Sequence, residues 1–277
     1  MEPAQDLREL LAWYVEAGAD EAIGEVPVNR YRAPAPVDNP APALAPTQSP
    51  TEAPILSPSA SPSNLTSTDS VTKSARELAA AATNLGALAE ALANFDGCAL
   101  RDTATNLVFS DGNPDSQVMI IGEAPGADED RQGLPFVGMA GQLLDRMLAT
   151  IGLDRSNTYI SNILPWRPPG NRKPTPSEVT ICLPFLRRHI ELMNPKILVL
   201  VGGTSAQALL GASQGITRLR GRWHDYTGVE SGSKKTDPIP AMPIFHPAYL
   251  LRKPGMKREA WRDLREIHRR LDDLGGA

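Results

Sequence analysis

The sequence predicts an α/β protein of three layers, in which helices cover both faces of a central, mainly parallel four-stranded sheet. Short, continuously apolar runs alternate with amphipathic stretches over the C-terminal two thirds of the chain. Continuous rather than alternating apolar runs are typical of parallel strands that are buried on both faces. The chain has 277 residues, 41% of them hydrophobic, which is enough for one sizeable core plus an accessory segment.

Four strands and four main helices follow from these patterns. The expected strands are 117–121, 158–164, 197–201 and 242–245. The expected helices are 138–151, 177–193, 204–210 and 257–274, and either Thr175 or Ser177 caps the second of them. Ligands of such sheets bind at the carboxyl ends of the strands, so the loops that follow the strands are the candidate site.

Three segments precede this domain, which is expected to span residues 95–277. Residues 1–26 contain apolar side chains at helical spacing and predict an N-terminal helix. Residues 27–73 are expected to form a disordered linker, because ten prolines fall within residues 27–64 and proline lacks the N–H that regular structure needs. An Ala- and Leu-rich run predicts a helix over 74–94 that leads into the domain.

Charge is divided unevenly along the chain, whose net charge is −4. Residues 1–94 hold 5 basic and 12 acidic side chains, whereas residues 95–277 hold 23 and 20. The first part repels a polyanion and the second tolerates one. No apolar run approaches the roughly 20 residues that span a bilayer, and the N-terminus does not resemble a secretory signal. With only two cysteines, the chain is expected to be a cytoplasmic protein.

The first candidate loop is IIGEAPGADEDRQGLPFVG, residues 120–138. Glu123 comes directly after a strand, and backbone N–H groups from Gly126 onward either face an anion or carbonyl, or belong to a plain turn. The loop contains neither a Walker sequence nor a GxGxxG fingerprint. This absence counts against a small-molecule enzyme that binds a nucleotide through a phosphate loop.

The second candidate loop is SNILPWRPPGNR, residues 161–172. Asn162 stands at a strand end where an apolar residue costs less, since an unsatisfied buried amide costs about 1–3 kcal/mol. Its side chain either pairs with the edge of a pyrimidine or satisfies local backbone groups. Arg167 and Arg172 flank rigid prolines and either hold phosphates or are ordinary solvated charges.

The third candidate loop is FHPAYLLR, residues 245–252. Pro247 suits the first turn of a helix, which places His246 at a helix N-terminus. The helix dipole there disfavours imidazolium, so a neutral imidazole can donate a hydrogen bond to developing negative charge. The alternative is a capping histidine without a catalytic role.

Taken together and in this order, the three loops resemble the uracil-DNA glycosylase superfamily, and most closely its family 4. The matching stretches are GEAPGADEDRQGLPFVGMAGQLLDRML (122–148), TYISNILPWRPPGNR (158–172) and HPAYLLR (246–252). The resemblance covers about residues 95–275. It implies that a uracil base leaves the DNA stack, enters the strand-end site and is released by hydrolysis of its glycosidic bond, leaving an abasic site.

The resemblance also implies roles for individual residues at the base. Asn162 matches the amide that reads the uracil edge and rejects cytosine, and Phe136 matches the aromatic ring that stacks on the flipped base. Glu129 matches the acid that crowds the 5-methyl position of thymine. His246 matches the electrophile that steadies negative charge on uracil O2.

Other positions match the water and the DNA backbone. Glu123 and the backbone of Ala124 match positions that line the site and place the water, and Glu123 is the expected activator because Ala124 stands where the most active members carry Asp. Arg252 is expected near a DNA phosphate. Leu250 and Leu251 either form a wedge that fills the vacated stack or belong to the core. The run Arg218, Arg220 and Arg222 either contacts the DNA backbone or is a solvated turn.

Cysteine usage departs from the family pattern. Family 4 members usually carry a 4Fe-4S cluster on four cysteines, and the match retains only Cys98 and Cys182. Phe95 and Trp166 occupy the other two positions and cannot bind iron. We therefore expect no cofactor and an apolar plug, defined as Phe95 and Trp166, in place of the cluster.

Two further readings of the sequence stay open. The chain is either an active glycosylase or a non-catalytic module that binds DNA lesions, and the histidine favours the enzyme. The protein is expected to be a monomer, and its N-terminal segment is expected to bind a protein partner. No membrane partner is expected.

Overall fold

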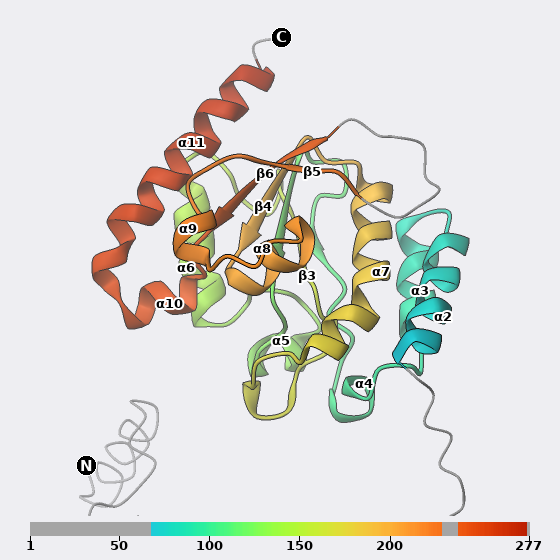
Figure 1. Cartoon of the computed structure of the whole chain (residues 1–277). Helices are drawn as coiled ribbons and strands as arrows, with labels where there is room; N and C mark the ends of the chain where they lie inside the picture. Colours follow the sequence, from blue (N-terminus) through green and yellow to red (C-terminus); the bar gives the residue numbers. More distant parts are fainter. Residues whose placement is uncertain (1–67, 229–237, 276–277) are drawn as a thin grey trace, which may run out of the picture. The chain divides into compact units, whose positions relative to one another are not determined.

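The computed structural model describes residues 68–228 and 238–275 (Figure 1). The expected N-terminal helix within 1–26 and linker residues 27–67 lie outside the described residues. Residues 68–73, expected in the linker, are instead helical. No helix in the described ranges has the length and apolar character that a membrane crossing requires.

Six strands form one sheet in the order β1-β3-β2-β4-β6-β5. Four of them are parallel neighbours in the centre: β3 (Tyr159–Asn162), β2 (Val118–Gly122), β4 (Ile197–Val201) and β6 (Ile239–Ile244). The edges are antiparallel: β1 (Asp111–Gly112) pairs with β3, and β5 (His224–Tyr226) pairs with β6. The predicted α/β sheet is confirmed in its parallel centre, and the two edge strands are additions. With two and three residues, these edge strands are too short to show a recognisable hydrophobic pattern in the sequence.

Helices cover both faces of this sheet, as the three-layer prediction requires (Figure 1). One face carries α2 (Thr68–Ala81), α3 (Leu85–Asn94), α7 (Pro176–Met193) and α8 (Gly203–Leu210). The other face carries α6 (Met139–Ala149), α10 (Pro247–Arg252) and α11 (Lys257–Gly275). Shorter helical segments are α4 (Leu100–Thr103), α5 (Ala127–Gln132), α9 (Ile216–Leu219), η1 (Pro169–Asn171) and η2 (Pro254–Met256).

Two apolar cores result, one on each face of the sheet. Strand β2 shows why: Met119 and Ile121 pack against the α7 side, whereas Val118 and Ile120 pack against the α6 and α11 side. Successive side chains of a strand point to opposite faces, so a strand buried on both sides needs an unbroken apolar run. All five residues of β2 are buried.

The helix predicted over 74–94 is wrong in its extent, because two helices, α2 and α3, occupy this region and the first begins at Thr68. Asn84 separates them. Its side chain accepts a hydrogen bond from the N–H of Ala87 at 2.9 Å and so caps α3. Asparagine at this position satisfies one of the N–H groups that a new helix leaves unpaired, and therefore starts a helix instead of continuing one. Asp69 in the first turn favours the earlier start of α2 through the helix dipole.

Helix α7 shows capping that decides between two predicted residues. Thr175 is the N-cap, and its hydroxyl accepts from the N–H of Glu178 at 3.2 Å. The carboxylate of Glu178 accepts in return from the N–H of Thr175 at 2.7 Å. This reciprocal pair fixes the start of α7 immediately after the loop that follows β3.

Candidate active site

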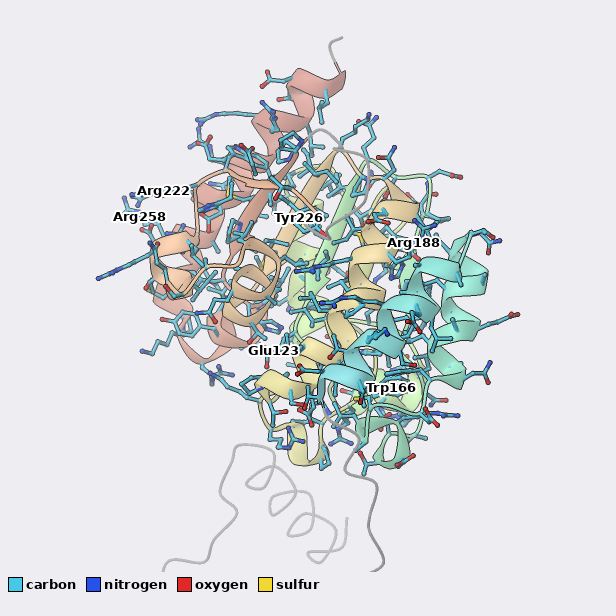
Figure 2. All side chains as sticks on the ribbon, turned by 45° about the vertical axis from the view of Figure 1, so that its right-hand side comes forward. Glu123, Trp166, Arg188, Arg222, Tyr226 and Arg258 are labelled. Atoms are coloured by element: carbon cyan, nitrogen blue, oxygen red, sulfur yellow. The ribbon has the colours of Figure 1, made fainter. Side chains whose placement is uncertain are left out.

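The three predicted loops meet at the carboxyl ends of the parallel strands. Asn162 ends β3, the 120–138 loop follows β2, and His246 follows β6. Glu123, the first residue of the 120–138 loop beyond β2, lies toward the lower end of the domain in Figure 2, where the strands of Figure 1 end. We call Glu123, Glu129, Phe136, Asn162 and His246 the strand-end cluster.

Close contacts join the members of this cluster. A Cβ atom at Gly122 would lie 2.3 Å from Oδ1 of Asn162 and 2.6 Å from the ring of Phe136, so only glycine fits between them. The ring of Phe136 is stacked near that of His246, with centroids 5.7 Å apart and planes inclined by 27°. The structure therefore brings together an amide, an aromatic face and an imidazole from three separate loops.

Asn162 carries an unusual unpaired atom. The residue is 5% exposed, and its buried Oδ1 has no hydrogen-bond partner among the described residues. A neighbouring residue on the same strand behaves differently, because the hydroxyl of Ser161 donates to the carbonyl of Phe109 at 2.7 Å. Leaving a buried acceptor unpaired costs about 1–3 kcal/mol. An acceptor retained at this cost is suited to a donor on a ligand.

Phe136 adopts a strained backbone conformation. Its φ is 56°, in the left-handed region that residues other than glycine rarely occupy. Its side chain is 6% exposed. Gly141 lies directly beneath, where a Cβ would come within 1.8 Å of the carbonyl oxygen of Phe136. The ring is therefore held by its surroundings and not by local backbone preference.

Glu129 binds the loop backbone with both carboxylate oxygens. Oε1 accepts from the N–H groups of Val137 and Gly138, each at 2.9 Å, and Oε2 accepts from that of Gly126 at 3.0 Å. The N–H of Gly126 is consequently occupied. Of the two readings left open for this N–H, the bond to Glu129 favours the turn, because the cap of α5 uses the group. Glu129 joins the two ends of the 126–138 loop and lies in the wall of the strand-end cluster.

His246 has a defined tautomer. It caps α10, and its Nδ1 accepts a hydrogen bond from the N–H of Ala248 at 3.2 Å. A neutral imidazole whose Nδ1 accepts carries its proton on Nε2. Burial lowers the pKa of His246, with Glu123 acting in the opposite direction and Arg252 reinforcing the effect of burial. The structure thus presents a neutral imidazole with one N–H to donate.

Glycine at position 202 allows another strand end to approach this imidazole. Gly202 follows β4 with a φ of 99°, and a Cβ there would lie 3.4 Å from Cβ of His246. The N–H of Gly202 donates to the carbonyl of Ile244 at 2.9 Å. This contact ties the end of β4 to the end of β6 and fixes the backbone that leads into His246.

Glu123 is held by a residue that the sequence did not single out. The hydroxyl of Thr204, in the first turn of α8, donates to Oε2 of Glu123 at 2.5 Å. The partners are 81 residues apart in the chain, so no local pattern reveals them. One oxygen of the carboxylate is thereby fixed. Ala124 follows, partly buried against the core on the α7 side.

Comparison with known proteins agrees with this geometry. A family model described as "Uracil DNA glycosylase superfamily" matches residues 109–265. This chain belongs to that superfamily.

The type-4 members of the superfamily named here are similar over most of their length. The type-4 uracil-DNA glycosylase of Archaeoglobus fulgidus is 41% identical over 174 residues, which are 61% of this chain and 84% of that protein. That of Thermotoga maritima is 40% identical over 166 residues, 60% of this chain and 82% of that protein. The type-5 uracil-DNA glycosylase of Pyrobaculum aerophilum is 32% identical over 114 residues, 36% of this chain and 50% of that protein.

The arginines expected at DNA differ in their surroundings. Arg172 forms two hydrogen bonds to Glu178, at 2.6 and 2.9 Å, and this pairing lowers the pKa of Glu178 to about 2. Nε of Arg167 donates to the side chain of Asn171 at 2.8 Å. Arg252 is exposed in the last turn of α10, close enough to His246 to influence its pKa.

The TRLRGRW run separates into two kinds of arginine. Arg220 pairs with Asp263 and Glu259 of α11, and its guanidinium lies 4.9 Å from the ring centroid of Phe245. It is a structural residue. Arg218 and Arg222 are exposed, so only they remain candidates for contact with a DNA backbone.

The four positions matched to the cluster ligands of family 4 lie in the core on the α7 side. Cys98 and Cys182 are buried with their sulfur atoms 3.9 Å apart, and Phe95 and Trp166 are 2% and 3% exposed in the same core (Figure 2 labels Trp166). A cubane cluster takes four thiolates, so these residues do not fit one. Among the described residues no group of three or more His, Cys, Asp or Glu side chains is arranged to hold a metal ion.

Proposed function

We infer that this chain is a uracil-DNA glycosylase, which hydrolyses the N-glycosidic bond of uracil in DNA and leaves an abasic site. The observation that carries the inference is the unpaired Oδ1 of Asn162, buried beside an aromatic ring and a neutral imidazole. Membership of the superfamily and about 40% identity to type-4 enzymes support the same function. The substrate is therefore uracil-containing DNA.

Base selection follows from the hydrogen-bonding capacity of Asn162. Its free acceptor takes the N3–H of uracil, and its NH₂ group donates to uracil O4. Cytosine has no hydrogen on N3 and carries a donor at position 4, so it leaves both sides mismatched. Phe136 supplies the face on which the flipped base stacks. Glu129 limits the space at the 5-position by holding the loop that forms this wall.

Bond cleavage leaves a sugar with positive charge and a uracil with negative charge. Nε2–H of His246 is the donor for uracil O2, and its neutral state places a hydrogen bond where charge develops. Glu123 orients a water toward the sugar through its remaining oxygen, while Thr204 holds the other. Water adds to the sugar carbon, its proton passes to the carboxylate, and the uracil anion leaves with the electron pair of the broken bond.

DNA contacts are assigned to Arg252 and Arg172, which are exposed, and to Arg167, which is partly buried. Arg252 follows directly from the His246 helix and is the proposed partner of a phosphate close to the flipped nucleotide. Arg167 and Arg172 lie on the loop after Asn162 and extend the same surface. Arg172 must share its guanidinium with Glu178, so its contribution is expected to be the smaller one.

The experiment that tests the function is a nicking assay on an end-labelled oligonucleotide with one uracil, followed by heating in alkali. Wild type is expected to cut, and Asn162→Ala and His246→Ala to lose about 10²–10³-fold in rate, as for the removal of one transition-state donor. Asn94→Ala and His268→Ala, at exposed positions on α3 and α11, are the matched controls and retain wild-type rates. Tight binding without cutting of single-stranded, U·G or U·A substrates would instead identify a lesion-binding module.

We further propose that the domain works without an iron–sulfur cluster. The apolar plug and the buried thiol pair support this, since only two of the four matched positions carry a thiol. The hydrogen bond that Cys182 donates to Cys98, together with burial, raises the pKa of Cys182 well above its usual range. Protein purified without chelators and under nitrogen is expected to contain far less than one iron per chain while cutting uracil DNA. Stoichiometric iron with visible absorption would refute the proposal.

A further inference from the structure

Arg155 lies in the loop between α6 and β3 and uses every donor that its guanidinium has. Nη1 donates to the carbonyl of Pro135 at 3.2 Å and to Asp111, and Nη2 donates to the carbonyl of Phe136. Nε and Nη2 reach the two oxygens of Asp145 at 3.2 and 3.4 Å. Five N–H donors make five contacts, which no other side chain can reproduce.

These contacts reach the one aromatic residue of the strand-end cluster. The peptide between Phe136 and Val137 is bound at both ends: its carbonyl accepts from Arg155 and its N–H donates to Glu129. A cation and an anion therefore hold opposite sides of the same peptide unit. The φ of 56° at Phe136 requires such an external constraint, because the left-handed conformation is unfavourable for residues with a side chain.

The two acids around Arg155 explain why it is held firmly. Asp111 comes from edge strand β1 and Asp145 from α6, so the guanidinium is anchored to two different elements. The side chain of Arg155 is 27% exposed. An arginine with several rigid partners loses little further freedom when it binds the loop carbonyls, in contrast to an isolated surface ion pair.

We propose that Arg155 is a positioning residue for uracil excision, which fixes the ring of Phe136 in the orientation that stacks on the flipped base. The proposal rests on the proposed function and deepens it. Arg155 touches neither the base nor the sugar, and acts only through the carbonyls of Pro135 and Phe136. Its loss therefore affects the DNA complex in which a base occupies the site and spares the complex in which the base is missing.

The test measures binding and cutting by full-length Arg155→Met. Two duplexes are compared: one carries a 2′-fluoro-arabino-deoxyuridine that resists cleavage, and the other carries a tetrahydrofuran abasic analogue. Arg155→Met is expected to bind the uracil analogue about 10-fold more weakly and the abasic analogue as wild type does. The rate of uracil excision falls about 10²-fold, the scale of a misplaced catalytic constellation. Arg155→Lys is expected to have nearly the same defects in binding and excision, because one ammonium group cannot bond to both loop carbonyls and both carboxylates.

A double-mutant cycle with Phe136→Ala separates positioning from general damage. If Arg155 acts through the ring, adding Arg155→Met to Phe136→Ala has little further effect. Arg188→Met is the matched control: Arg188 also donates to a loop carbonyl, that of Ala82, but lies on α7 away from Glu123 (Figure 2). It is expected to leave excision unchanged.

The outcomes that overturn the proposal are specific. Equal losses on the two duplexes, or full additivity with Phe136→Ala, assign Arg155 to general structure. If Arg155→Met binds neither duplex, the Asp111→Asn variant decides, since it removes one anchoring carboxylate and leaves the guanidinium in place. This variant is then expected to bind the uracil analogue more weakly, by a smaller factor, and the abasic analogue as wild type does. An equal loss of binding to both duplexes overturns the proposal. Failure of wild type to cut uracil DNA would refute the proposed function and is seen independently of any Arg155 variant.

Discussion

The strand-end cluster and the apolar plug lie at the two ends of the same short segment, yet their packing and hydrogen bonding differ. Asn162 ends β3 and Trp166 follows four residues later. At the first position a buried acceptor is unpaired and a nearby phenylalanine is strained. At the second, two large and mainly apolar side chains, Phe95 and Trp166, are buried in the core. Asn162 also lines a cavity of about 10 Å³, together with His189 and Cys182.

The contrast shows which residues of this domain stabilise the folded state and which residues destabilise it. Unpaired acceptors and left-handed backbone raise the energy of the folded state and are retained where a ligand relieves them. Buried aromatic rings lower it. Substitutions in the plug should therefore lower the free energy of unfolding and leave the rate of uracil excision unchanged. Substitutions in the strand-end cluster should lower the rate of excision and change the free energy of unfolding little.

The largest effect on stability is expected from Trp166→Ala. Removing a 3% exposed indole leaves a cavity and costs about 3–5 kcal/mol of unfolding free energy. Urea unfolding followed by circular dichroism measures the loss, and the folded fraction at low temperature should still cut uracil DNA. Trp261→Ala, at a residue that is 43% exposed on α11, is the matched control and should cost less than about 1 kcal/mol. Loss of activity without loss of stability would break the comparison.

An intermediate effect on stability is expected at His189, which lines the same cavity as Asn162. His189 is buried, its Nε2 lies 2.9 Å from the hydroxyl of Tyr159, and burial lowers its pKa to about 3. The unfolded chain, with a histidine pKa near 6.5, therefore binds more protons between these values, and stability falls as pH drops from about 6.5 to about 3. His189→Gln should reduce that slope by up to about 1.4 kcal/mol per pH unit.

Urea unfolding across this pH range measures the slope. His268→Gln, an exposed substitution on α11, should keep the wild-type profile. An unchanged slope in His189→Gln would show that other groups control acid unfolding.

The smallest effect on stability is expected at the site of the largest effect on activity. Asn162→Ala removes an amide whose Oδ1 has no partner among the described residues, so the unfolding free energy should fall by no more than about 1 kcal/mol. Ser161→Ala, one residue earlier, breaks a hydrogen bond and should cost about 1 kcal/mol while excision persists. Thermal unfolding of the two variants in parallel would sharpen the comparison. A strongly destabilised Asn162→Ala would show that the amide serves the fold.

Much of the fold was predictable because the parallel strands are continuous apolar runs. The runs at 117–121 and 197–201 correspond to β2 and β4, since burial on both faces leaves no room for alternation. Edge strands β1 and β5 have two and three residues and carry no period. The break at Asn84 was missed because alanine and leucine on both sides favour helix.

The strand-end cluster was predictable in its members and less so in its support. Asn162 and His246 stand out because polar residues at strand ends are conspicuous. Thr204 and Arg155 do not, since their partners lie 81 and up to 44 residues away and their residue types are ordinary on a surface. Glu129 was assigned to the base, but its bonds to Val137 and Gly138 are visible only in the folded loop.

The proposed replacement of two iron ligands by Phe95 and Trp166 has a consequence for the conditions under which repair can proceed. Contacts between aromatic rings and aliphatic side chains contain nothing for a chelator to extract or for oxygen and superoxide to attack. In the cluster-free domain proposed above, stability depends on temperature, because apolar packing weakens on cooling, and is not expected to depend on the supply of iron.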